Sequence, residues 1–239
     1  MSQPPVVIIT GASRGLGAAV ADWLARVGAA LTLTARSTDS LAETAAAVAH
    51  LGGQALPLAA DAADPEAAEQ VVRETIDRFG RIDAVINNAG ILNPIARLAD
   101  ADPAQWRRTI EVNLLGPVYL IRAALPFLTR SGGRAVNVSS GAADGWSADC
   151  AAKAGLTHLT RVLAAEHPEI TAVSIRPGVV DTRMQTEIRE RGDGGMTAEA
   201  VAGFRRLEAD GALEPPAVPG RAIAWLALKA PADWSGRCL

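Results

Sequence analysis

Short runs of β-branched and apolar residues alternate with longer alanine-rich segments along the chain, and this alternation constrains the fold more than any other feature. Such short apolar runs are typical of strands buried on both faces, and the alanine-rich segments have the length of helices. Strands that alternate with helices predict a parallel sheet covered on both faces. We predict strands near residues 5–10, 30–35, 54–59, 82–87, 133–139 and 170–176, and helices near 15–27, 38–50, 64–79, 103–130, 148–166 and 218–229.

Length and composition limit the classes of protein that this chain can represent. With 239 residues, of which 49% are hydrophobic, the chain fits one domain over residues 1–239. Its net charge is −3 and it has no basic run, so we expect no nucleic-acid partner. We find no signal peptide and no stretch of about 20 uncharged apolar residues, so we expect no membrane partner. Two cysteines, Cys150 and Cys238, provide neither a disulfide framework nor a metal motif, which favours a cytoplasmic protein without a metal.

A glycine-rich loop, Thr10-Gly11-Ala-Ser13-Arg14-Gly15-Leu16-Gly17, lies between the first predicted strand and the first predicted helix. Glycines at this junction allow a tight turn and a close backbone approach to a ligand. The start of a helix also offers free N–H groups and a partial positive charge. The loop therefore predicts a binding site for the pyrophosphate of a dinucleotide.

The spacing of this loop, Gly-x-x-x-Gly-x-Gly, resembles that of the short-chain dehydrogenase/reductase family. Further motifs follow in the family's order over nearly the whole chain: Asp61 after the third strand, Asn87-Asn88-Ala89-Gly90 after the fourth, Asn113, Ser139-Ser140 after the fifth, Lys153, and residues 177–182. This resemblance implies a Rossmann-type, doubly wound single domain that transfers hydride between a nicotinamide and a small-molecule carbonyl or alcohol. Residues 139–147 and 176–184 look most like the sepiapterin reductase and fungal benzil reductase branch.

The end of the second strand indicates which nicotinamide cofactor is bound. Residues 35–37 contain no acidic residue that could bind the ribose 2′-hydroxyl of NAD. Arg36 and Arg14 instead offer two guanidinium groups suited to a 2′-phosphate, which favours NADP(H), although two solvated arginines are the alternative. The resemblance implies a cofactor site made of Gly11, Ser13, Arg14, Gly15, Leu16, Gly17, Arg36, Asp61, Ala62, Asn88, Ala89, Gly90, Lys153, Pro177, Gly178, Val180 and Thr182.

The proposed catalytic position departs from the family's pattern. The family uses a serine to hold the carbonyl oxygen, a tyrosine to exchange the proton, a lysine to lower the tyrosine pKa and an asparagine to position a water. By position these residues are Ser140, Asp149, Lys153 and Asn113, so an aspartate stands where the tyrosine is expected. Tyr119 is the only tyrosine in the chain.

Asp149 is a poorer proton donor than tyrosine on simple chemical grounds. A phenol has a pKa of about 10 and an aspartic acid one of about 3.9, and a neighbouring ammonium lowers either value. We therefore expect an Asp149 anion at neutral pH, unless burial raises its pKa enough to make it an acid. Its side chain is also short, and only eight residues separate it from Ser140, fewer than is usual in the family.

A polar, glycine-rich stretch near residues 178–208 predicts a mobile substrate flap that ends in a short helix at 197–208. By resemblance Thr182 bonds the nicotinamide carboxamide, and the segment from Met184 onward folds over the substrate. Ser140, Trp146 and Met184 are the expected substrate contacts, with core packing the alternative for Trp146. We expect Trp225 in the core, the start of a last strand at 235–239, and a homodimer or homotetramer formed through the helices at 103–130 and 148–166.

These observations leave three hypotheses for function. The first is an NADP(H)-dependent oxidoreductase whose turnover is impaired because Asp149 replaces the tyrosine. The second is a non-catalytic NADP(H)-binding protein that acts as a sensor or structural partner. The third is a former reductase with a lineage-specific or engineered lesion, which the sequence does not distinguish from the second.

Overall fold

A six-stranded parallel sheet forms the centre of the molecule in the computed structural model, which describes residues 3–141 and 145–239. The strand order is β3-β2-β1-β4-β5-β6. This is the order of a doubly wound Rossmann fold, in which the crossovers reverse direction between β1 and β4. The strands are β1 (Val6–Thr10), β2 (Ala30–Ala35), β3 (Gln54–Ala59), β4 (Ala84–Asn87), β5 (Arg134–Val138) and β6 (Thr171–Ile175).

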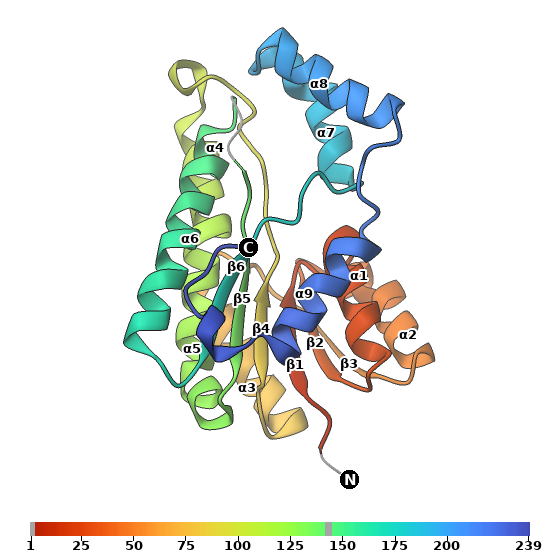
Figure 1. Cartoon of the computed structure of the whole chain (residues 1–239), viewed down its shortest axis with the longest axis vertical. Coiled ribbons are helices and arrows are strands. Elements are labelled where there is room, and N and C mark those ends of the chain that lie inside the picture. The colour runs from red at the N-terminus through yellow and green to blue at the C-terminus, as the bar shows by residue number, and fades with distance from the viewer. Residues whose placement is uncertain (1–2, 142–144) are drawn as a thin grey trace.

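Helices cover both faces of this sheet (Figure 1). One layer packs α1 (Gly15–Ala25), α2 (Ala42–His50) and α9 (Ala217–Lys229) over a large apolar cluster. The other face carries α3 (Pro65–Phe79), α4 (Pro103–Ile110), α5 (Gly116–Ser131) and α6 (Ser147–Glu166). The predicted fold class and all six predicted strands are confirmed.

Local sequence explains where two of these helices begin. Asp64 and Asp102 stand directly before α3 and α4, and each carboxylate accepts a hydrogen bond from a backbone N–H of the first turn. A proline follows each aspartate, at a position where the missing N–H costs nothing.

The predicted helix at 103–130 is continuous but changes its winding in the middle. Residues Glu111–Leu115 form a π-helical turn between α4 and α5. By length and composition the stretch Pro103–Ser131 could span a membrane, a test that core helices of soluble proteins also pass. Its apolar side chains Leu120, Ile121 and Leu128 pack against the sheet, which accounts for its hydropathy.

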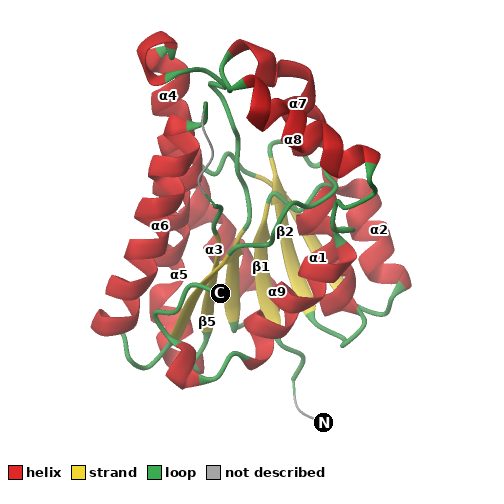
Figure 2. Cartoon of the chain, turned by 45° about the horizontal axis from the view of Figure 1, so that its top comes forward, coloured by secondary structure: helices red, strands yellow, loops and turns green. Residues whose placement is uncertain are grey.

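The flap is more regular than the sequence predicted. It contains α7 (Arg183–Arg191), a 3₁₀ turn (Gly192–Gly194) and α8 (Ala198–Ala209), of which only α8 was expected. Helix α7 was not predicted because the stretch is rich in glycine and charged residues, and few side chains of the helix are buried. Figure 2 shows α7 and α8 lying beyond the ends of the strands. Two backbone hydrogen bonds close the base of the flap, from Asp181 N to Glu214 O (2.8 Å) and from Glu214 N to Val179 O (2.9 Å).

A small apolar cluster fastens the flap to the domain. It consists of Leu92, Ile95, Trp146, Ile188, Met196 and Val201, with Phe204 packed on the indole of Trp146 at a centroid distance of 5.4 Å. Gly195 also approaches the backbone of residues 95–96 so closely that a β-carbon there would lie 2.4 Å from the α-carbon of Ala96.

The end of the chain differs in part from the prediction. Cys238 pairs with Ser174 as a single parallel bridge beside β6, as expected for the start of a last strand. The prediction that Trp225 lies in the core is wrong, because this side chain is 46% exposed. It packs on Trp234 at the surface, which the helical pattern of α9 did not reveal.

We predict that Gly195→Ala loosens the flap whereas Gly194→Ala does not. An added methyl group at Gly195 meets backbone atoms that cannot move aside, while at Gly194 no atom of the described residues lies within 4 Å of the same group. Limited proteolysis should therefore cleave the Gly195→Ala variant faster within residues 183–209. Equal cleavage rates for the two variants would show that this contact does not hold the flap.

Candidate functional site

The glycine loop between β1 and α1 packs so closely on itself and on the segment after β4 that Gly11 and Gly17 leave no room for a side chain. Gly11 has a φ of +64°, and its β-carbon would lie 2.9 Å from the α-carbon of Ala89. A β-carbon at Gly17 would lie 2.3 Å from the carbonyl oxygen of Gly11. The N-terminus of α1 has no side-chain cap, so its backbone N–H groups remain available to an anion. These features fit the pyrophosphate of a dinucleotide.

Asn88 and Thr10 fix the loop in this position. The Asn88 amide donates to the carbonyl oxygens of Thr10 (2.9 Å) and Gly11 (3.1 Å). The Thr10 hydroxyl accepts hydrogen bonds from the backbone N–H groups of Asn88 and Ala89, both at 3.0 Å. Asn88 and Thr10 therefore hold the loop in place. Thr10 was named from sequence as the first residue of the loop, but its supporting hydrogen bonds were not predicted.

The adenosine end of the predicted site lies where β2 and β3 end. Arg14 and Arg36 are both exposed, and the charge of Arg36 acts on Asp61. Burial raises the pKa of Asp61, but hydrogen bonds from Ala63 N and Arg108 outweigh this effect, so the pKa is lowered. Asp61 is therefore an anion at neutral pH.

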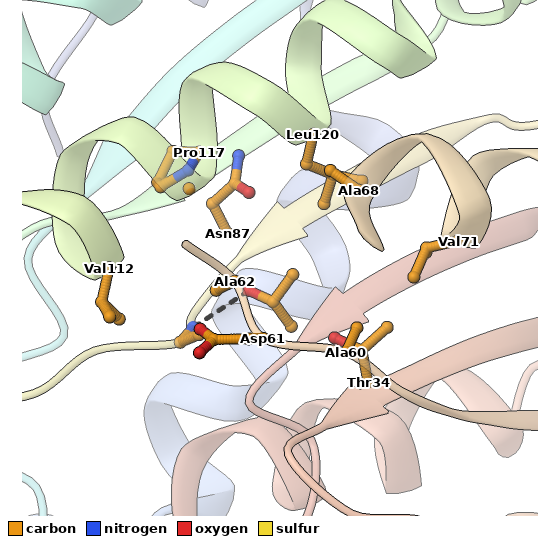
Figure 3. A pocket seen from close by; sticks show the side chains of 13 residues that line it. Thr34, Ala60, Asp61, Ala62, Ala68, Val71, Asn87, Val112, Pro117 and Leu120 are labelled. Atoms are coloured by element: carbon orange, nitrogen blue, oxygen red, sulfur yellow. Dashed lines mark hydrogen bonds between the residues drawn. The ribbon is translucent and has the colours of Figure 1, made fainter. Parts of the chain in front are cut away.

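A small cavity of about 20 Å³ lies beside Asp61, with room for a single water molecule. Figure 3 shows it between the helical side chains Val112, Pro117 and Leu120 and the segment at residues 60–62. Val112 and Ala62 make this region apolar next to the carboxylate of Asp61. Val112 was missed from sequence, although it directly precedes Asn113.

Asn113 is completely buried and joins three segments of the chain. Its side-chain oxygen accepts from Ile91 N (2.9 Å), and its amide donates to Ile91 O (2.8 Å) and to Asp149 Oδ1 (2.8 Å). It lies in the π-helical turn, a feature that often marks functional sites.

Asp149 lies one turn before Lys153 on α6, and both side chains are buried. Burial raises the pKa of Asp149, and the charge of Lys153 and the Asn113 hydrogen bond offset only part of this effect. The Lys153 ammonium does lower this pKa, as expected, but burial raises it by more, so the net shift is upward and the structure favours the alternative in which burial makes Asp149 a weaker acid. Desolvation of a carboxylate outweighs one nearby cation.

A backbone carbonyl at the end of β5 fixes the side chain of Lys153. Its ammonium donates to the carbonyl oxygen of Val138 at 2.6 Å, and burial lowers its pKa. A β-carbon at Gly90 would lie 3.8 Å from this nitrogen and 3.6 Å from Asn113 Oδ1. Asn113, Asp149, Lys153 and Gly90 are thus brought together at the carboxyl ends of β4 and β5.

Ser140, unlike Asn113, Asp149 and Lys153, is not buried. It follows β5, is partly exposed, and donates its hydroxyl to Gly141 O at 3.0 Å. The preceding Ser139 is buried and bonds the hydroxyl of Thr157 at 2.8 Å. Part of the segment that joins Ser140 to α6 lies outside the described residues.

The flap brings one predicted residue to the glycine loop. The methyl group of Thr182 lies 3.2 Å from the position of a β-carbon on Gly15, so the stem of the flap touches the loop. Pro177 and Gly178 follow β6, and Val180 is buried in the stem. Trp146 is buried, and its indole N–H has no hydrogen-bond partner among the described residues, while Met184 is 38% exposed on α7. Leu16 and Ser13 are partly buried in the glycine loop.

Within the described part of the chain, no group of three or more His, Cys, Asp or Glu residues could hold a metal ion. The buried side chains of Asn113, Asp149 and Lys153 lie beside a loop whose shape suits a dinucleotide. The glycine cradle, the open start of α1 and the carboxylate of Asp61 fit such a cofactor.

Known proteins are similar to this chain in sequence. The family model described as short chain dehydrogenase matches residues 5–193. A benzil reductase ((S)-benzoin forming) of Saccharomyces cerevisiae is 35% identical over 247 residues, covering 94% of this chain and 90% of the relative. An uncharacterized oxidoreductase of Schizosaccharomyces pombe is 34% identical, covering 93% and 90%.

Solved structures agree with this assignment. The crystal structure of the KRED1-Pglu enzyme is 40% identical, with a TM-score of 0.93 over 98% of this chain and all of that chain. An alcohol dehydrogenase from the archaeon Thermococcus sibiricus, complexed with 5-hydroxy-NADP, is 30% identical with a TM-score of 0.82, covering 99% and 95%. Fold, glycine loop and relatives agree that this chain belongs to the short-chain dehydrogenase family, whose members are oxidoreductases that bind nicotinamide cofactors.

Proposed function

We propose that this protein is an NADP(H)-dependent oxidoreductase that acts on a small carbonyl compound or secondary alcohol, with slow turnover. The observation that carries the proposal is the buried group of Asn113, Asp149 and Lys153 beside Gly90, next to a loop suited to a dinucleotide. When bound, the nicotinamide supplies or accepts the hydride. The side chains of this group then position the substrate oxygen and exchange its proton.

NADP(H) is favoured by charge at the adenosine end. Arg14 and Arg36 are exposed at the start of α1 and the end of β2, where a 2′-phosphate would accept hydrogen bonds from both guanidinium groups. The archaeal alcohol dehydrogenase with a similar structure was crystallised with 5-hydroxy-NADP.

Slow turnover follows from the side chain at position 149. We assign Asp149 to the position of the family's tyrosine because it lies buried, one turn before Lys153, and contacts Asn113. A carboxyl group is shorter than a phenol, and here one of its oxygens is already bound to the Asn113 amide. Loss of a well-placed general acid lowers rates by about 10²–10⁴.

The flap supports an apolar substrate. The cluster that joins the flap to the domain, which includes Leu92, Trp146 and Met196, is apolar, and Leu92 directly follows Ile91, whose backbone bonds Asn113. A ketone or diketone with an aromatic or alkyl substituent fits these surroundings, and the benzil reductase relative is named for a substrate of this kind. We also propose a homodimer or homotetramer through α4–α5 and α6.

The cofactor preference can be tested with single arginine variants. We expect Arg36→Ala and Arg14→Ala each to weaken NADPH binding by about tenfold or more, because each removes a charge-assisted hydrogen bond. NADH binding should stay within about twofold, since NADH lacks the 2′-phosphate. Arg26→Ala, an exposed arginine at the far end of α1, is the matched control for isothermal titration. Equal affinity of the unaltered protein for both nucleotides would contradict the assignment.

Restoring the phenol tests the assignment of Asp149. We expect Asp149→Tyr to raise kcat for reduction of an activated diketone by about 10²–10⁴ without changing NADPH affinity. Asp149→Glu, which extends the carboxyl by one methylene, should give a smaller gain and guards against misfolding of the bulkier variant. If neither variant exceeds the unaltered protein while both bind NADPH, position 149 does not limit turnover.

Residual activity should depend on pH in a defined direction. Burial raises the pKa of Asp149, so the carboxyl carries its proton at higher pH than an ordinary aspartic acid. A general acid works only when protonated, so reduction should accelerate as the pH falls, and this acceleration should begin at a higher pH than an ordinary aspartic acid would allow. Asp149→Asn should remove this dependence, because an amide does not titrate. NADPH binding measured at the same pH values separates this effect from loss of cofactor.

A further inference from the structure

A second charged group lies at the adenosine end, outside the motifs that identify the family. Arg108, on the last turn of α4, donates from Nη2 to Asp61 Oδ2 at 2.5 Å. Its Nη1 lies 3.6 Å from Glu111 Oε2, one turn further along the same helix. Arg108 thus links the end of β3 to the helix that carries Asn113.

This contact completes the set of donors around the Asp61 carboxylate. The other oxygen, Oδ1, accepts from the backbone N–H of Ala63 at 3.0 Å. With one donor on each oxygen, the plane of the carboxylate is fixed, although the side chain is 42% exposed. A carboxylate has about four acceptor positions, so it can still accept a hydrogen bond from a ligand.

The surroundings of Asp61 define the ligand group that fits. The carboxylate adjoins the apolar residues Ala62, Ala89 and Val112 at the cavity of Figure 3. The cavity holds only one water molecule. A flat heterocycle would therefore lie against the exposed side of Asp61, where the carboxylate can accept a hydrogen bond from an exocyclic amino group such as that of adenine. Hypoxanthine has a carbonyl oxygen at the same place, and two acceptors facing each other repel.

We propose that Arg108 is a positioning residue that orients the Asp61 carboxylate toward the 6-amino group of the cofactor's adenine and so sets base selectivity. The inference rests on the proposed function, since it requires a bound adenine dinucleotide. Arg108 acts through Asp61 and not on the phosphates. Its removal should therefore weaken a nucleotide with the amino group more than one without it.

The Arg108–Asp61 ion pair contributes little to the stability of the fold. Arg108 and Asp61 are 40% and 42% exposed, and exposed ion pairs contribute little to stability. An Arg108 variant should accordingly remain folded, which makes nucleotide selectivity measurable.

The test compares NADPH with its hypoxanthine analogue, reduced nicotinamide hypoxanthine dinucleotide phosphate, by titration. We expect the unaltered protein to prefer NADPH by about tenfold, the size expected for one hydrogen bond to a charged group. Arg108→Ala should reduce this preference to about threefold or less. Arg107→Ala, which removes an exposed arginine from the same helix turn, should leave it unchanged.

Arg108→Lys provides a rescue, because an ammonium group can still pair with Asp61 and should restore part of the preference. An equal loss of affinity for both nucleotides in Arg108→Ala would overturn the proposal, because it would show a general electrostatic or structural effect. An unchanged preference in that variant would overturn it as well. If the unaltered protein binds neither nucleotide, the proposed function itself fails and this inference falls with it.

Discussion

The three hydrogen bonds of the Asn113 side chain hold the centre of this site together. One amide group joins the segment after β4, through both backbone groups of Ile91, to Asp149 on α6. Because Asn113 is fully buried, any segment that moved away would leave a polar group without a partner. The relative positions of the segment after β4 and of α6 therefore depend on a residue that comes from neither of them.

Much of the fold was predictable from sequence because its signals are local. The buried strands are short apolar runs, and the glycine loop needs glycine at positions where the backbone turns or touches another segment. Helix α7 was missed because only Gln185 and Ile188 are buried on it, too few to produce a helical pattern of apolar residues. Trp225 was wrongly assigned to the core because a helical pattern does not show whether a tryptophan packs against the sheet or against another tryptophan at the surface, as Trp225 does with Trp234.

The candidate site was predictable only as far as family motifs reached. Asn113, Asp149 and Lys153 were correctly grouped, but the electrostatic balance among them was not. The sequence reveals that a lysine is near the aspartate, whereas the degree of burial, which dominates the pKa of Asp149, comes from the packed structure. Arg108 was missed for a similar reason, because it is separated from Asp61 by 47 positions and no motif links them.

The π-helical turn at Glu111–Leu115 has a consequence for how this site can change over evolution. Each residue of an α-helix turns the chain by about 100°, so one inserted or deleted residue rotates every later side chain to another face. A helix that contains a π-helical turn accommodates an extra residue within a length that still fits the sheet. Loss of one residue between Arg108 and Gly116 would leave a regular helix of good composition but would turn the Asn113 amide away from Ile91. The site is thus encoded by the number of residues in this helix as well as by their identity.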